Sequence, residues 1–280
     1  MLPQQLALVS ETKKISTSEL TRVGAALQKQ VMRDFAPVWN VEASVSAFSK
    51  LEDVPIGYWP IIVRDDIEMP GAAGVHEDKD GQPFALVQHS NSWSLTASHE
   101  CLEMLADPFG NRLIAGDSIK PGQGRVEYLV EVCDPSEDAQ FAYTVNGVLV
   151  SDFYSCHFFD PLPAAGVQYS FTGAIKSPRE VLKGGYLSWH DPVTDHWWQQ
   201  VYFGPKKQFR DLGVFGQLTE SLRATIDRMT PLPQLQSGLK SNNPLLMATR
   251  AAAKNVDKAT TSKAKMWRVE IRQLLKTAAK

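Results

Sequence analysis

The sequence predicts one α+β domain followed by a basic extension, and three observations lead to this prediction. The chain has 280 residues, 43% of them apolar, which is enough to bury a full core. Helical periodicity near the start gives way to short segments with strand character. Residues 240–280 hold ten Lys or Arg and two Asp or Glu, a net charge of +8, which leaves −10 on the rest of the chain. We therefore expect an N-terminal segment (1–15), a folded domain (16–231) and a linker with a basic, partly helical extension (232–280).

The domain is predicted to begin with a long amphipathic helix. Ser16 and Glu19 have the spacing of a capping box, and apolar residues then recur every three or four positions up to Pro37. In the segments that follow, alternating apolar residues or β-branched and aromatic residues indicate strands, and polar residues with Gly and Pro indicate a loop. They predict strands at 41–48 and 58–63, a loop at 65–83, a third strand at 84–89 and a helix at 95–106. A twisted mixed sheet backed by the first helix is what the family resemblance described below implies for these elements.

Beyond Pro108 the pattern changes to short apolar segments separated by Gly and Pro. They predict strands at 126–132, 142–150, 169–175 and 197–203, with one helix at 219–228. Residues 189–198 hold two histidines around an Asp-Pro turn flanked by tryptophans, which predicts a hairpin with a polar tip. This half of the domain is therefore expected to be rich in strands and loops.

The helix predicted at 95–106 carries the sequence H-E-x-x-E and stops at Asp107 before a proline. His99 and Glu103 are four residues apart, so both project from one face of the helix, as two metal ligands must. Glu100 follows the first ligand, where a general base for a metal-bound water would be placed. This is the zinc-peptidase arrangement with glutamate in place of the second histidine.

A third ligand has to come from another segment, because a catalytic zinc site usually combines three protein ligands with a water. The candidate segment is Glu-Val-Cys-Asp-Pro at 131–135, which follows an apolar strand and carries two carboxylates near the strand end. We favour Glu131 as the third ligand and keep Asp134 as the alternative. A short motif of this kind arises easily by chance. The strand before the helix and the carboxylate pair after it support its interpretation as a metal site.

The order of these elements resembles the N-terminal half of the zincins, the peptidases with an H-E-x-x-H motif. That resemblance implies a long helix behind a twisted sheet and an exposed edge strand that binds an extended substrate, for which 84–89 is the candidate. The segments 98–108, 131–134 and 143–150 are also similar to the core of the plant phosphate-induced, EXORDIUM-type proteins and of related bacterial proteins with an H-E-x-x-E motif. The cysteine departs from that pattern, because it precedes Asp134 here. The resemblance implies a metal site and brings no settled substrate.

We therefore expect a zinc-dependent hydrolase, most simply a metallopeptidase, in which Glu100 activates metal-bound water. Mn²⁺ is an alternative ion, because one histidine with two carboxylates neutralises the metal and acidifies its water less. A separate donor for the oxyanion is expected, with Tyr143, Tyr154 and His157 in the right region and no choice made among them. The alternative function is a catalytically silent zincin fold that serves as a binding or structural component of a phage or secretion-type assembly.

Composition also limits partners and compartment. The three cysteines lack C-x-x-C spacing and fit a reducing compartment. Neither a secretory signal nor an apolar stretch long enough to span a bilayer is found, so we expect a cytoplasmic protein without a membrane span. Besides a peptide or protein substrate, an acidic partner or nucleic acid could bind the basic tail at 240–280. The acidic body argues against nucleic acid as the substrate of the domain.

Overall fold

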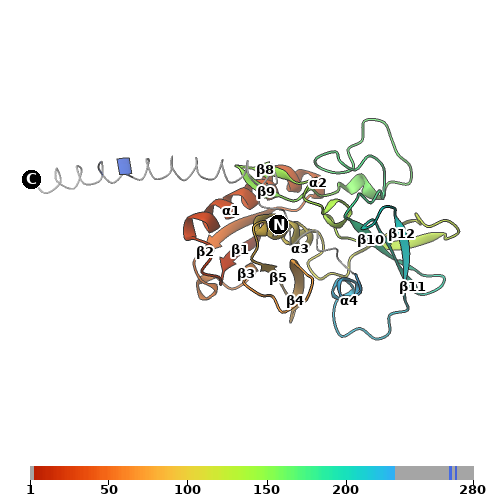
Figure 1. Ribbon diagram of the computed structural model, residues 1–280, viewed down its shortest axis with the longest axis horizontal. Coiled ribbons are helices and arrows are strands. Elements are labelled where there is room, and N and C mark those ends of the chain that lie inside the picture. Colours follow the sequence, from red (N-terminus) through yellow and green to blue (C-terminus); the bar gives the residue numbers. More distant parts are fainter. Residues whose placement is uncertain (1–2, 231–264, 267–268, 270–280) are drawn as a thin grey trace, which may run out of the picture.

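The computed structural model describes residues 3–230 together with Lys265, Met266 and Val269, and it has a mixed α+β fold (Figure 1). Two five-stranded sheets occupy the two halves of the described chain, and a two-stranded hairpin accompanies them. The predicted fold class is therefore confirmed at this level. The predicted linker lies outside the described residues, as does the basic extension apart from the three residues named above, which are helical.

The first sheet is mixed and contains most of the N-terminal half. In spatial order its strands are β2 (Ala43–Phe48), β1 (Gln4–Ser10), β3 (Trp59–Arg64), β5 (Gln82–Gln88) and β4 (Gly74–Lys79). Four strands are parallel, and β4 alone runs antiparallel, to β5. The middle of β1 is fully buried, from Leu6 to Val9, as expected for a parallel strand covered on both faces.

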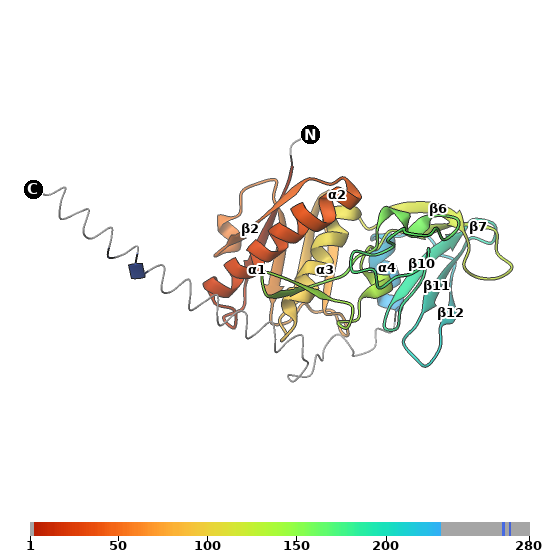
Figure 2. The same cartoon turned by 90° about the horizontal axis from the view of Figure 1, so that it is seen from above.

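Two long helices lie side by side against this sheet (Figure 2). They are α1 (Thr17–Lys29), which continues through a π-helical turn (Gln30–Phe35) into α2 (Ala36–Trp39), and α3 (Trp93–Ala106). Ser16 caps α1, because its Oγ accepts a hydrogen bond from the Glu19 amide at 3.2 Å. Both helices confirm their sequence predictions. α1 packs on β1 and β2, and α3 packs on β3, β4 and β5.

Two strands of the first sheet depart from the sequence prediction. β1 lies in the segment 1–15 that was expected to precede the domain, yet it pairs with both β2 and β3. β4 lies inside the stretch 65–83 that was predicted to be a loop. Its polar sequence reflects its place at the edge, where one side of the backbone has no strand beside it. The strand predicted at 84–89 is β5, and it lies between β3 and β4. The expectation that it forms the exposed edge is therefore wrong, because β4 is the edge.

The second sheet is antiparallel. In spatial order its strands are β12 (Gln208–Gly213), β11 (His196–Val201), β10 (Tyr186–Asp191), β7 (Arg125–Leu129) and β6 (Leu113–Asp117). β10 and β11 form the predicted hairpin. β8 (Tyr143–Val145) and β9 (Val148–Val150) form a separate hairpin within the strand predicted at 142–150. The strand predicted at 169–175 is wrong, because only an isolated bridge between Tyr154 and Ser170 forms there.

The last described element of the fold connects the second sheet to the first. This is α4 (Leu222–Met229), whose Ile226 packs with Trp197 of β11 and Leu212 of β12 in a small apolar cluster. Ser221 caps the helix through a hydrogen bond from the Ala224 amide at 3.1 Å. Among the described residues, no helix is both long and apolar enough to cross a membrane.

Candidate metal centre

The H-E-x-x-E motif lies in the buried part of α3. His99, Glu100 and Glu103 are each at most 8% exposed, on a helix that is buried from Ala97 to Ala106. Asp107 ends the helix, and its Oδ2 accepts a hydrogen bond from the Arg112 amide at 2.7 Å. Burial of three ionisable side chains on one helix is costly unless each finds a partner of opposite charge. The partners come from segments far away in the sequence.

Glu103 and Asp134 both approach the ring of His99. The Nε2 atom of His99 lies 3.1 Å from Glu103 Oε2 and 3.3 Å from Asp134 Oδ1. Two ligand atoms that are each about 2.0 to 2.1 Å from a tetrahedral zinc ion lie about 3.3 Å apart. Both separations from His99 Nε2 are of this size, and they are also those of ion pairs between the same groups. Of the two candidates for the third ligand, the structure places Asp134 next to His99.

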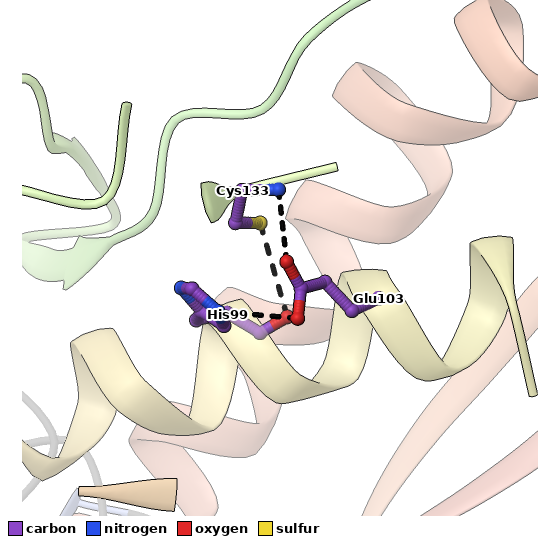
Figure 3. A group of neighbouring side chains, drawn as sticks. All are labelled: His99, Glu103 and Cys133. Carbon is purple, nitrogen blue, oxygen red and sulfur yellow. Dashed lines mark hydrogen bonds and ion pairs between the residues drawn. The ribbon is translucent and has the colours of Figure 1, made fainter. Parts of the chain in front are cut away.

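The carboxylate of Glu103 is held in its orientation by the backbone. Its Oε1 accepts a hydrogen bond from the Cys133 amide at 3.0 Å, while its Oε2 faces His99 (Figure 3). The Cys133 thiol donates to the carbonyl oxygen of His99 at 3.8 Å. Burial raises the pKa of this thiol well above its ordinary value, with the charge of Glu103 adding to the effect. The sulfur therefore stays protonated at neutral pH and acts as a packing atom in the metal-free protein.

Two further carboxylates extend the cluster. A carboxylate oxygen of Glu131 lies within 4.8 Å of carboxylate oxygens of Glu103 and Asp134. A carboxylate oxygen of Glu137 likewise lies within 4.8 Å of an oxygen of Asp134 and a ring nitrogen of His99. Both oxygens of Glu131 are buried without a hydrogen-bond partner of proper geometry among the described residues. Oε2 lies 3.1 Å from Nη1 of Arg223, so Oε1 alone lacks a partner of opposite charge among the described residues, and a bound cation would satisfy it.

The cluster holds more negative than positive charge. Burial, with the charge of Glu103 adding to it, raises the pKa of Asp134 to about 7. Burial likewise raises the pKa of Glu131 and of Glu137 well above their ordinary values. Burial alone would raise the pKa of Glu103 as well, but the charges of His99 and Arg223 outweigh it and hold that pKa well below the ordinary value. Buried carboxylates in excess must take up protons or hold a cation.

Glu100 faces the other side of α3, towards β4 and α4. Its Oε2 accepts a hydrogen bond from Nη2 of Arg223 at 3.2 Å and lies 3.6 Å from Nδ1 of His76. Arg223 belongs to α4 and is 3% exposed, and its Nε also pairs with Asp227 at 3.0 Å. The proposed base and the proposed ligands therefore lie on adjacent sides of one charge cluster.

A pocket of about 510 Å³ opens onto the cluster. His99, Glu100 and Asp134 line its floor, α4 contributes Arg223, and residues 68–72 before β4 form another wall. A volume of this size accommodates a few residues of a peptide or a small molecule. Three of the five side chains that the sequence singled out thus line the pocket, whereas Glu103 and Glu131 do not.

The structure brings all five predicted residues, Glu100 included, into one cluster, but sequence reasoning missed four of its members. His76 lies in the stretch predicted to be a loop, and Arg223 and Asp227 lie in a helix predicted without a function. Glu137 is the remaining one, and its position six residues after Glu131 was the only available signal. No local pattern connects His76 or Arg223 with the motif, because the contacts with Glu100 join residues 24 and 123 positions apart.

The three candidates for an oxyanion donor lie in different surroundings. Tyr143 donates its hydroxyl to Asp34 at 2.9 Å, and His157 pairs with Asp160 in an exposed position. Tyr154 is fully buried, and burial raises the pKa of its hydroxyl well above the ordinary value, with the charge of Glu131 adding to the effect. None of the three lines the pocket at the cluster.

Comparisons with known proteins were made with the sequence and with the fold. No family model, no curated protein and no solved structure matches this chain.

Gly74, the first residue of β4, allows the edge strand to approach the motif closely. A Cβ atom at this position would lie 2.6 Å from Glu100 Oε1 and 2.6 Å from Thr96 Cγ2, distances that no relaxed structure contains. We expect Gly74→Ala to displace Glu100 or the start of β4 and to destabilise the fold by about 1 to 3 kcal/mol, as measured by denaturant unfolding. Gly124→Ala, where the new methyl group meets open space, is the matched control. An unchanged free energy of unfolding in Gly74→Ala would contradict the assigned close approach.

The raised pKa values make a prediction for the metal-free protein. The pKa of Asp134 is about 7 in the folded state against an ordinary value of 3.8, so the folded state keeps a proton that the unfolded state releases between these values. Stability therefore falls as pH rises through this window. Burial lowers the pKa of His99, but Glu103 and Asp134 outweigh it and raise that pKa well above 6.5, which adds a loss of stability at still higher pH.

We expect the metal-free protein to have a Tm several degrees lower at pH 8 than at pH 5.5, measured by thermal unfolding in the presence of a chelator. Asp134→Asn removes one of the titrating groups and should reduce the difference. Added zinc should raise the Tm more at pH 8, because protons compete with the metal at the lower pH. An equal or higher Tm at pH 8 without metal would contradict the assigned charge excess.

Proposed function

We propose that this protein is a metal-dependent hydrolase with His99, Glu103 and Asp134 as the metal ligands and a peptide as the substrate. The observation that carries the proposal is the approach of two carboxylate oxygens, Glu103 Oε2 and Asp134 Oδ1, to 3.1 and 3.3 Å from His99 Nε2. A buried excess of carboxylates around the same point supports a cation there. Glu131, which the sequence favoured as third ligand, is close enough to Glu103 and Asp134 to serve as a further carboxylate of the set.

The donor set fits zinc and also allows manganese. One imidazole nitrogen with carboxylate oxygens is a set that both ions accept in proteins. When bound, the ion would polarise a substrate carbonyl and make a water molecule more acidic. A set with more carboxylates than histidines lowers the effective charge of the ion, so we expect a slower nucleophile at neutral pH than in a site with three histidines.

Glu100 is the residue that we assign to proton transfer. It is next to His99 in the sequence, lines the pocket, and is held by contacts with Arg223 and His76. In the proposed reaction its carboxylate accepts a proton from the attacking water and returns it to the amine that leaves. Gly74 leaves room for this side chain, because a Cβ at that position would lie 2.6 Å from Glu100 Oε1.

The edge strand β4 is the proposed docking site for the substrate backbone. β4 pairs with β5 on one side only, and its first residue contacts Glu100. An extended peptide that adds to such an edge gains backbone hydrogen bonds and reaches across the pocket. Docking of this kind favours a peptide over other substrates with a hydrolysable carbonyl.

The proposal is tested by measuring metal content and hydrolysis on the same preparation. The full chain is dialysed against zinc, its bound metal is quantified by mass spectrometry, and it is then incubated with a library of quenched fluorescent peptides. We expect about one tightly bound ion per chain, together with hydrolysis that a chelator stops and zinc restores. Protein without bound metal would contradict the site. Bound metal without hydrolysis of any library member would favour the silent binding role.

A further inference from the structure

We propose that the site is a two-cation centre in which the guanidinium group of Arg223 is the permanent second cation, beside the metal ion. This inference rests on the proposed function, because it takes His99, Glu103 and Asp134 as the holder of the first cation. Arg223 then acts as a positioning residue, which fixes Glu100 relative to Glu103. Three features of the structure support this inference.

The first feature is a second donor set on the other side of Glu103. His76, Glu100 and Glu103 each place a ligand atom within 4.8 Å of the others, and all three are buried. His76 Nε2 lies 3.0 Å from the carbonyl oxygen of Asp107. This contact assigns the proton to Nε2 and leaves the lone pair of Nδ1 facing the donor set. Histidines that bind metals in proteins are held in the same way, by a carbonyl on the opposite ring nitrogen.

The second feature is the cation that fills this set. Nη1 of Arg223 lies 2.7 Å from Glu103 Oε2 and contacts Nδ1 of His76, while Nη2 lies 3.2 Å from Glu100 Oε2. The guanidinium group therefore contacts every member of the donor set. Nη1 also lies 3.1 Å from an oxygen of Glu131, so one side chain approaches four residues of the cluster.

The third feature is the anchoring of Arg223 from outside the cluster. Its amide donates to the carbonyl oxygen of Gly110 at 3.0 Å, and the Leu222 amide donates to Asn111 at 2.9 Å. Ile226, one turn further along, lies in the apolar cluster with β11 and β12. These contacts hold α4 against the second sheet independently of the charges. The guanidinium group is therefore a fixed part of the site.

The charges in the cluster leave room for both cations. Six carboxylates surround Arg223 and the two histidines, namely Glu100, Glu103, Glu131, Asp134, Glu137 and Asp227. One guanidinium group does not balance them, and Glu131 Oε1 has no hydrogen-bond partner among the described residues. Glu103 is shared by both donor sets, as a carboxylate is in centres with two metal ions. Arg223 thus takes the place that a second ion would have.

The inference predicts a gain of metal when the guanidinium group is removed. In Arg223→Met the set of His76, Glu100 and Glu103 loses its cation and becomes free to bind an ion. By equilibrium dialysis against zinc, we expect about one ion per chain in the unchanged protein and about two in this variant. Arg223→Lys retains a cation and should bind one. Arg228→Met removes an exposed arginine of the same helix and is the matched control, also with one ion.

The outcomes separate this inference from the proposed function. One ion in both the unchanged protein and Arg223→Met would overturn the second donor set while leaving the first intact. No ion in the unchanged protein and one in the variant would show that Arg223 competes for a single site, which also overturns the inference. No ion in either protein would remove the proposed function itself. Arg223→Met leaves the buried carboxylate of Asp227 without its partner, which can prevent folding. In that case the double variant Arg223→Met with Asp227→Asn removes the unpaired charge, and two ions per chain are again expected.

Discussion

Glu100→Gln is expected to abolish peptide hydrolysis while the protein keeps its metal. Glutamine has nearly the same shape, so it can still accept the hydrogen bond from Arg223 that Glu100 accepts at 3.2 Å. It cannot take a proton from water or return one to the leaving amine. General acid and base catalysis contributes about 100-fold to 10,000-fold, and one residue would serve both steps here. We therefore expect turnover to fall by about 10,000-fold, measured on the most reactive library peptide.

The control for this prediction is the same change of glutamate to glutamine at a position outside the cluster. Glu127 is an acidic residue of β7 that pairs with His190 at 3.2 Å, outside the cluster. Glu127→Gln should leave both turnover and metal content unchanged. Metal content of Glu100→Gln equal to that of the unchanged protein would locate the defect in proton transfer. Retention of more than a tenth of the activity in Glu100→Gln would rule out Glu100 as the base.

His99→Ala is expected to remove the metal. His99 Nε2 is the atom that Glu103 and Asp134 share, so its loss leaves only carboxylates in the proposed set. Changes to groups that only support a ligand weaken metal binding by about 10-fold to 100-fold, and we expect loss of the ligand itself to exceed that range. Zinc affinity is measured by competition with a chromophoric chelator. Hydrolysis should disappear at zinc concentrations that saturate the unchanged protein.

A stability measurement supplies an independent readout for the same variant. Zinc that binds only the folded state stabilises it, by about 2.7 kcal/mol at a concentration 100 times the Kd. The unchanged protein should therefore gain thermal stability with zinc, and His99→Ala should not. His157→Ala, which removes an exposed histidine paired with Asp160, should respond as the unchanged protein does. A zinc-dependent rise in Tm that is equal in His99→Ala would place the ion elsewhere.

The errors in the predicted strands have separate physical causes. β1 is covered on both faces, so Leu6 to Val9 form a continuous apolar run without the alternation that marks a half-buried strand. β4 is an edge strand with a charged end, and its composition is close to that of a loop. Strand 169–175 was predicted from apolar residues that pack in the core without pairing, as Tyr169 and Ile175 do.

The sequence by itself determined the helix, its end at Asp107 and the common face of His99 and Glu103, because these follow from a repeat of 3.6 residues within one segment. It also indicated that 131–134 would supply a carboxylate. Only the tertiary structure decided that Asp134 lies beside His99, that β4 is the edge, and that His76 and Arg223 enter the cluster. The reason is that local periodicity specifies which face of an element is buried, whereas the convergence of charges depends on how distant elements pack together.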